Sequence, residues 1–205
     1  MKKLALAAAT AVALTASGAS AATLSGEYWD LPSNSISNIN QAIAAVASLT
    51  TTATFDATDI NYGDSANNWR IASLTTFLAG DSGSITGTDD GNMQESVFRI
   101  FGKVSLNDGD QINVTSDDGF RLIIGGNTFS EFLGIRAPNN TTSGVWAGGS
   151  GIFEASLWYF EGQETQAQLK SNLVAYAAPV PVPASAFLLI SAIGGIAAMR
   201  RRKKA

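Results

Sequence analysis

The chain has 205 residues, with 13 Lys and Arg against 17 Asp and Glu, and it contains neither Cys nor His. The lack of Cys excludes a disulfide framework and thiolate chemistry, and the lack of His excludes Ser-His-Asp and Cys-His nucleophile systems and the usual zinc ligand. A pair of carboxylates, for example among Glu131, Glu154 and Glu161, is the catalytic arrangement that remains, and no pattern supports it. We therefore expect that the protein is not an enzyme.

The first 21 residues have the organisation of a secretory signal peptide. Lys2 and Lys3 precede an apolar stretch over residues 4–14, and Ala19 and Ala21 supply the small-x-small cleavage pattern. We expect signal peptidase to remove residues 1–21, so that the mature protein begins at Ala22.

A strand and a short helix are predicted at the start of the mature chain. Residues 24–31 form the strand, which Pro32 ends. Ser33 or Ser35 is the expected N-cap of the helix, because apolar residues recur after them at steps of three and four: Ile36, Ile39, Ile43 and Val46. From residue 50 to the tail, no other segment has convincing helical periodicity.

The strongest strand pattern lies within residues 97–124. One face of its first strand is apolar, with Phe98, Ile100, Val104 and Leu106. Turn sequences at 107–110 and 116–119 separate this strand from two shorter ones, and the near-regular spacing predicts a β-meander. A long polar loop, residues 136–151, leads to strands at 152–161 and 167–176. The fold class is therefore mainly β, an antiparallel β-sandwich with one short N-terminal helix.

Several of these segments carry a resemblance to a known domain family. They are LSGEYW at residues 24–29, FRIFGKV at 98–104, SDDGFRLIIGG at 116–126 and LWYFE at 157–161. The chain resembles the protective-antigen-type β-sandwich, a domain found in toxins, glycosidases and adhesins. The resemblance covers about residues 24–173 and implies one domain over residues 22–178, with the helical stretch 33–48 as a departure from the family pattern.

The resemblance implies a binding site at Asp117 and Asp118. In lectin-like adhesins of this family, paired aspartates bind calcium and, through it, sugar hydroxyls, so calcium is the expected cofactor and extracellular polysaccharide an expected partner. A turn in which both side chains cap backbone amides explains the same residues, and both interpretations stay open. Trp146, in a Gly-rich segment, is a candidate to stack on a sugar ring, with packing at the end of the sandwich as the alternative.

Residues 179–205 combine a proline motif, an apolar run over 184–199 and five cations at 200–204. The prolines keep the motif extended, and the cations hold the end of a membrane-inserted run on the cytoplasmic side. This tail resembles the Val-Pro-x-Pro-Ala variant of the Pro-Glu-Pro-type sorting signal read by exosortases, with the motif formed by Val180, Pro181, Val182, Pro183 and Ala184. The resemblance implies transient anchoring through the hydrophobic helix, cleavage by an exosortase-type enzyme, and a cell-surface or extracellular location. A permanent tail anchor is the alternative, although 16 residues is shorter than the usual span of about 17–25.

Without the two terminal segments, the chain has six basic and 17 acidic residues, which gives a net charge of −11. This acidity disfavours nucleic acid as a partner and is compatible with calcium binding. We expect an exported, surface-sorted bacterial protein with a calcium-dependent carbohydrate-binding β-sandwich that associates with the cell envelope or extracellular matrix. The alternative is a purely structural component of the envelope or biofilm matrix that has no ligand.

Overall fold

The computed structural model describes residues 22–32, 36–63, 73–89, 91, 93, 95–163 and 166–178. The predicted signal peptide and the predicted sorting tail lie outside these ranges. Within them, no helix is both long enough and apolar enough to span a bilayer.

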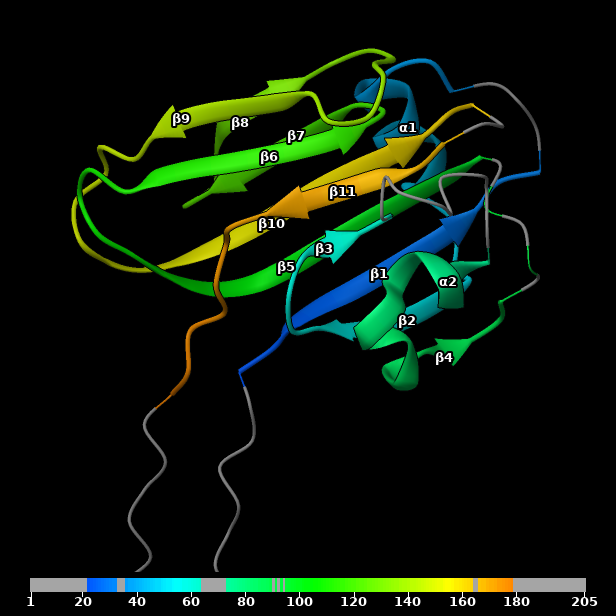
Figure 1. Ribbon diagram of the computed structural model, residues 1–205, viewed down its shortest axis with the longest axis horizontal. Helices are drawn as coiled ribbons and strands as arrows, with labels where there is room; N and C mark the ends of the chain where they lie inside the picture. The colour runs from blue at the N-terminus through cyan, green and yellow to red at the C-terminus, as the bar shows by residue number, and fades with distance from the viewer. Residues whose placement is uncertain are drawn as a thin grey trace, which may run out of the picture. The chain divides into compact units, whose positions relative to one another are not determined.

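Two antiparallel sheets form the body of the protein (Figure 1). The larger sheet has seven strands in the order β4-β2-β1-β5-β10-β7-β8. Its strands are β1 Leu24–Asp30, β2 Ala53–Ala57, β4 Thr86–Gly87, β5 Ser96–Leu106, β7 Phe120–Ile124, β8 Asn127–Phe132 and β10 Gly151–Glu161. The smaller sheet, in the order β3-β11-β6-β9, contains β3 Asn61–Tyr62, β11 Gln168–Ser171, β6 Gln111–Asp117 and β9 Thr141–Val145.

The main core lies between the two sheets and confirms the predicted β-sandwich. Side chains alternate between the two faces of a strand, so every second residue of a half-covered strand is buried. The four apolar residues predicted to share a face of β5 all lie in this core: Phe98, Ile100, Val104 and Leu106. From the smaller sheet, Ile112, Val114 and Leu169 complete it.

The predicted β-meander is wrong. β5 pairs with β1 and β10, whereas β7 pairs with β10 and β8. The strand between them in sequence, β6, belongs to the other sheet, where it lies between β11 and β9. The chain therefore crosses from one sheet to the other before β6 and again after it. Turn sequences indicate where strands end, but they do not identify the partners of each strand.

The predicted N-terminal helix is present as α1 Ile39–Val46. Its N-cap is Asn38, whose Oδ1 accepts from the amides of Asn40 and Gln41, and not Ser33 or Ser35, which lie outside the described residues. The buried side of α1 packs on the outer face of the larger sheet, in a second cluster with Trp29, Val97 and Phe160. Asn38 suits this position because its side chain satisfies amides that have no partner in the first helical turn.

Several elements lie where the sequence predicted no helix or strand, β9 among them within the predicted polar loop 136–151, and four of these elements show why. They are α2 Leu74–Leu78, the 3₁₀ helix Ala79–Ser84, and the strands β8 and β9. The two helical segments are too short to produce a periodic apolar pattern. β8 and β9 are sheet-edge strands with few buried residues, so their sequences lack the alternation that identified β5 and β6.

Both ends of the described chain leave the sandwich on the same side, below β1 and β5 in Figure 1. Ser25 near the start pairs with Phe101, and Ala175 near the end bridges to Val104. At the opposite end of β5, Ser96 pairs with both Asp30 and Glu161. The terminal residues of β1 and β10 therefore mark the end of the sandwich that is remote from both chain ends.

Candidate functional site

Asp117 and Asp118 lie where the chain passes from the smaller sheet to the larger one. Asp117 is the last residue of β6, and Asp118 and Gly119 connect it to β7. The peptide bond between the two aspartates is cis. Backbone hydrogen bonds fix this connection against β10, because the Asp118 amide donates to the Phe160 carbonyl and the Phe160 amide donates to the Gly119 carbonyl.

Glu161, the last residue of β10, joins the two aspartates. Each of the three residues offers a carboxylate oxygen, and these oxygens all lie within 4.8 Å of one another. All three residues are buried, with exposed fractions of 4% for Asp117 and 0% for Asp118 and Glu161. Buried carboxylates are rare without a compensating partner. The geometry therefore defines an acidic cluster, consisting of Asp117, Asp118 and Glu161.

The hydrogen bonds to the cluster are unevenly distributed. Asp118 accepts from the Arg136 amide through Oδ1, at 3.1 Å, and from the Gly162 amide through Oδ2, at 3.0 Å. Glu161 Oε1 accepts from the Gln163 amide at 2.8 Å. Asp117 Oδ2, in contrast, is buried and has no hydrogen-bond partner among the described residues. An acceptor of this kind costs free energy unless a proton or a cation satisfies it.

Burial raises the pKa values of all three carboxyl groups. The pKa of Glu161 rises to about 10, first because of burial and then because of the charge of Asp118. The pKa of Asp117 rises to about 7 for the same two reasons. Burial also raises the pKa of Asp118, although the Gly162 and Arg136 amides oppose that change. Without a cation, the cluster therefore retains protons at neutral pH.

Arg136 supports the cluster from the side of the smaller sheet. Its guanidinium donates to Ser116 Oγ at 2.7 Å and to Thr142 Oγ1 at 3.0 Å, and it lies over the ring of Phe132 at 4.7 Å. The positive charge of Arg136 opposes the rise in the pKa of Asp117. Through its side chain and its amide, Arg136 connects β6, β9 and Asp118.

The donor set of the cluster fits a hard divalent cation. Calcium takes six to eight oxygen ligands, commonly from Asp and Glu carboxylates, backbone carbonyls and water. Asp117, Asp118 and Glu161 would supply the carboxylate part of such a set, and the buried Asp117 Oδ2 is already without a competing donor. The cluster has only oxygen donors, which suits calcium or magnesium better than zinc.

The other predicted sugar-binding residue, Trp146, lies at the opposite end of β6. It follows β9, whose last residue pairs with Gln111 at the start of β6. Its ring is half-buried and packs against Phe153, with centroids 4.8 Å apart, and against Phe129. Its Nε1 donates to the Gly149 carbonyl at 2.7 Å. The structure therefore does not bring Trp146 together with Asp117 and Asp118.

The sequence did not indicate two members of this site. From the sequence, Glu161 is only part of a closing strand and one of three glutamates in an unsupported catalytic pair, and Arg136 is only the start of a polar loop. A charged residue at the end of an apolar, aromatic run is the one signal that could have singled out Glu161. Arg136 reaches the cluster through a connection of irregular structure, so no periodic pattern places it there.

Comparisons with known proteins identify similar solved structures but no sequence family. No protein-family model and no curated protein matches the chain. The PA14 sugar-binding domain from an RTX adhesin is 26% identical, with a TM-score of 0.62, over 78% of this chain and 93% of that domain. The PA14 domain of the antifreeze protein MpAFP is also 26% identical, with a TM-score of 0.63, over 83% of this chain and 90% of the other.

A more distant similarity involves a yeast adhesin. The epithelial adhesin 6 A domain of Candida glabrata, solved in complex with Galb1-3GlcNAc, is 14% identical, with a TM-score of 0.50, over 78% of this chain and 83% of that domain. At this identity the likeness concerns the fold alone. The chain is thus a mainly β protein whose two antiparallel sheets form a β-sandwich like that of PA14 domains.

Proposed function

We propose that this protein is an exported, surface-sorted bacterial protein whose β-sandwich binds carbohydrate through a calcium ion at the acidic cluster. The observation that carries the proposal is the convergence of three buried carboxylates, one with an unsatisfied oxygen. The similarity to a PA14 sugar-binding domain from an adhesin supports the same function. Calcium, when bound, supplies positive charge and further coordination positions that sugar hydroxyls occupy as neutral oxygen ligands.

Three carboxylates would bind the calcium ion, and two backbone amides would orient one of them. Asp117, Asp118 and Glu161 would hold the cation after losing the protons that their raised pKa values retain. The amides of Gly162 and Arg136 orient the Asp118 carboxylate, so it would meet the cation with little loss of side-chain entropy.

An apolar rim lies next to the cluster and would contact the ring faces of a sugar. Phe132, Leu133 and Ile135 immediately precede Arg136, and their exposed fractions are 36%, 46% and 41%. Sugar rings present apolar C–H faces that pack against such side chains, as aromatic and aliphatic residues do in other ligand sites. This rim would provide the sugar contact for which Trp146 was one candidate in the sequence.

The position of the cluster suits a protein attached through its C-terminal end. The chain leaves the described domain beside Val104, at the end of the sandwich opposite Glu161 (Figure 1). Signal peptidase would remove residues 1–21 on export, and an exosortase-type enzyme would then act at residues 180–184, which follow the end of the described domain that does not carry the cluster. Extracellular polysaccharide of the envelope or matrix is the proposed partner.

A glycan array probed with the full chain, in millimolar calcium and in chelator, tests this function. We expect glycan signals that calcium supports and chelator removes. The double variant Asp117→Asn, Asp118→Asn should lose these signals, and Glu161→Gln should weaken them. Asp56→Asn is the matched control, because Asp56 is an exposed β2 residue remote from the cluster, and it should bind as the wild type does. If no glycan gives a calcium-dependent signal, the structural-component alternative is favoured.

A further inference from the structure

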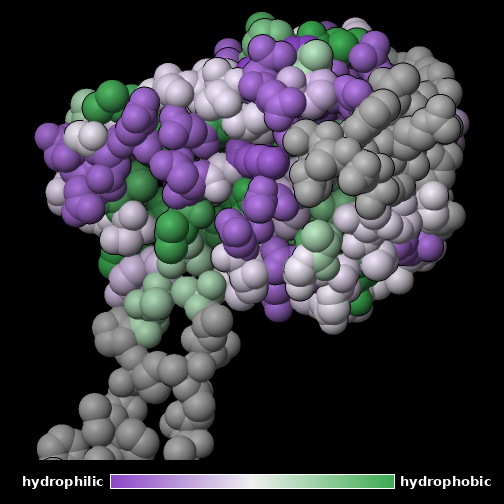
Figure 2. Space-filling view, in the orientation of Figure 1, coloured by the Kyte–Doolittle hydropathy of each residue, from purple (hydrophilic) through white to green (hydrophobic). Residues whose placement is uncertain are grey.

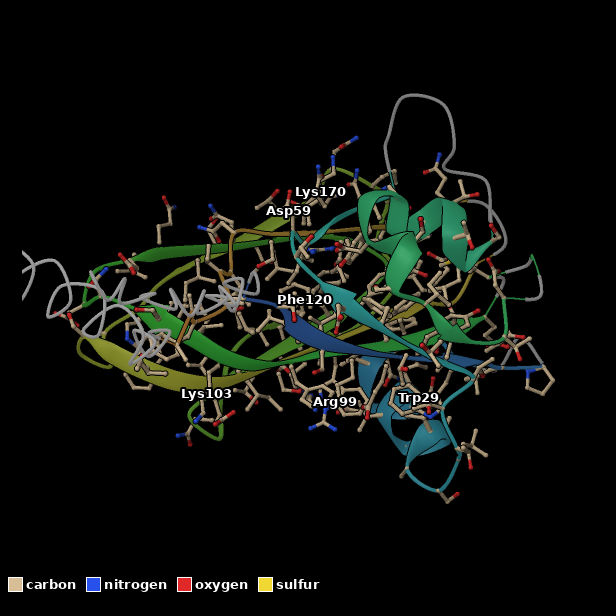
Figure 3. The ribbon with its side chains drawn as sticks, turned by 90° about the horizontal axis from the view of Figure 1, so that it is seen from below. Trp29, Asp59, Arg99, Lys103, Phe120 and Lys170 are labelled. Carbon is tan, nitrogen blue, oxygen red and sulfur yellow. The ribbon has the colours of Figure 1, made fainter. Side chains whose placement is uncertain are left out.

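A polar groove lies on the outer face of the smaller sheet, away from the acidic cluster. It has a volume of about 240 Å³ and spans β3, β11 and β6. Figure 2 shows that hydrophilic residues cover much of this face, and Figure 3 places Asp59 and Lys170 together on it. The groove is lined by polar side chains, among them Asp59, Asn61, Asn113, Thr115, Lys170 and Asn172.

Sheet register explains why these side chains meet. Lys170 pairs with Asn61 on one side and with Thr115 on the other, which gives one row across three strands. Two residues along the strands, the Asn113 amide donates to Asn172 Oδ1 at 2.8 Å. The alternate residues of the same strands, Tyr62, Val114 and Leu169, are buried in the main core. The floor of the groove is therefore built on three paired strands, and Asp59, from the connection between β2 and β3, and Asn172, just after β11, complete its lining.

The groove contains hydrogen-bonding groups that the described part of the protein does not use. Within the described residues, neither the Lys170 ammonium nor the Asp59 carboxylate has a hydrogen-bond or ion-pair partner. Asn113 Oδ1 is buried and likewise has no donor there. Asn172 differs, because its Oδ1 accepts from the Asn113 amide and its Nδ2 donates to the Gln111 carbonyl.

The described cations on the opposite face of the protein are paired with carboxylates. On the outer face of the larger sheet, three ion pairs are present: Arg99–Glu27, Lys103–Glu154 and Arg121–Glu131. Figure 3 shows Arg99 and Lys103 on the side of the molecule away from Lys170. Among the described cations, Lys170 is therefore the one that has neither an ion-pair nor a hydrogen-bond partner.

We propose that this groove is a second carbohydrate subsite, which binds a neutral hydroxyl-rich sugar unit without calcium. A carboxylate accepts hydrogen bonds only and an ammonium donates them only, so a ligand that bridges Asp59 and Lys170 must do both. Sugar hydroxyls do both. The groove carries one positive and one negative side chain, so a neutral unit meets no like charge. The inference does not depend on the acidic cluster.

The acidic cluster and the groove are separate places in the fold. Gln168 lies between them on β11, paired with Asp117, and its side chain is held by the Asn139 amide at 2.7 Å. Gln168 is buried, with an exposed fraction of 1%. A sugar unit in the groove therefore contacts neither Asp117 nor the cation proposed there.

Ligand-observed saturation-transfer NMR on the full chain, with chelator present throughout, tests the second subsite. The probes are the methyl glycosides of glucose, galactose, mannose and N-acetylglucosamine. We expect at least one of them to bind weakly to the wild type and to Asp117→Asn, Asp118→Asn. Lys170→Ala and Asp59→Ala should each weaken that binding by about tenfold or more, because each removes a hydrogen bond to a charged group.

Two controls keep the test decisive. Lys103→Ala removes an exposed cation from the other sheet and should leave glycoside binding unchanged. Circular dichroism and the melting temperature verify that the groove variants fold. The proposal is overturned if no glycoside binds in chelator, or if Lys170→Ala binds as the wild type does. It is also overturned if Lys170→Ala instead abolishes a concentration-dependent dimer, which would assign the groove to a second copy of the chain.

Discussion

The hydroxyl of Tyr159 hydrogen-bonds to the backbone carbonyl of Asp117, and so links the larger sheet to the last residue of β6 in the smaller one. The same hydroxyl lies 3.2 Å from Glu161 Oε2. Tyr159 is fully buried, and burial raises its pKa well above the usual value. It therefore stays protonated and acts as a fixed support beneath two members of the acidic cluster.

Removal of this hydroxyl should weaken both the fold and the site. We expect Tyr159→Phe to lower the free energy of unfolding by about 1–3 kcal/mol, because it leaves the buried Asp117 carbonyl without this donor. Calcium affinity should also fall, since Asp117 loses its support from β10. Urea denaturation and calorimetric titration measure the two effects. Tyr176→Phe, at a half-buried position near the chain end, is the matched control and should change neither quantity. An unchanged unfolding free energy in Tyr159→Phe would contradict this role.

Calcium should raise the melting temperature of the wild-type protein. Like charges on three neighbouring carboxylates repel one another, and a divalent cation relieves that repulsion while it gains oxygen ligands. A ligand that binds only the folded state stabilises it by roughly 2.7 kcal/mol at about 100 times the dissociation constant. Differential scanning calorimetry in calcium and in chelator measures the shift, which Asp117→Asn, Asp118→Asn should abolish. Equal melting temperatures in both conditions would show that Asp117 and Asp118 only stabilise a turn and bind no calcium.

The stability of the calcium-free protein should decrease as the pH rises. The pKa of Glu161 is 4.5 in the unfolded reference and about 10 in the fold, so between these values folding takes up a proton. Where the folded state binds more protons than the unfolded state, the free energy of unfolding falls with increasing pH. Asp117, with its pKa raised to about 7, adds to the decrease in the lower part of this range.

Glu161→Gln should remove much of this pH dependence, because glutamine resembles the protonated carboxyl group and does not titrate. Denaturation curves in chelator at several pH values between about 5 and 9 measure it. In calcium the trend should reverse for the wild type, since the cation binds the deprotonated carboxylates. Glu131→Gln is the control, because Glu131 is a half-exposed partner of Arg121 and lies outside the cluster. A Glu161→Gln profile parallel to that of the wild type would show that another group controls the pH dependence.

Gly119 should not tolerate a side chain. A Cβ at this position would lie 2.6 Å from Phe160 Cε1 and 2.7 Å from the Phe132 carbonyl oxygen. We expect Gly119→Ala to destabilise the fold by about 1–3 kcal/mol, the usual cost of overpacking, and to displace Asp118. Gly134→Ala is the matched control, since a Cβ there meets nothing within 4 Å. Chemical denaturation compares the two variants, and equal stabilities would show that the connection adjusts freely.

The sequence predicted local features of the fold better than distant ones. The alternation in β5 identified its buried face, and the DDG sequence located the connection that carries Asp117 and Asp118. The proximity of Glu161 depends on β10 inserting between β5 and β7, a long-range pairing with no local signal. The same limitation explains the incorrect meander, because the spacing of strands along the chain does not determine which strands are neighbours in a sheet.

The groove on the smaller sheet could not have been predicted for a related reason. Its residues come from three strands and the segments next to them, and the pairing of β11 with β3 and β6 brings Asp59, Lys170 and Asn113 to one place. In the sequence, Lys170 and Asn113 are ordinary polar residues on the solvent side of a strand, and Asp59 is an ordinary polar residue between two strands. The pairing of three distant segments, and not any single motif, creates the groove.

The mature protein should begin at Ala22 and lose its tail near residues 181–184. The motivation is the pair of processing signals, a small-x-small site after an apolar stretch at one end and a proline motif before an apolar run and five cations at the other. Intact-mass measurement on protein recovered from the cell surface or the medium tests both cleavages. A mass that lacks residues 1–21 but retains residues 200–204 would establish the permanent tail anchor instead. Replacing Pro181 and Pro183 with alanine should block the second cleavage alone, because the motif would then no longer be held extended for the sorting enzyme.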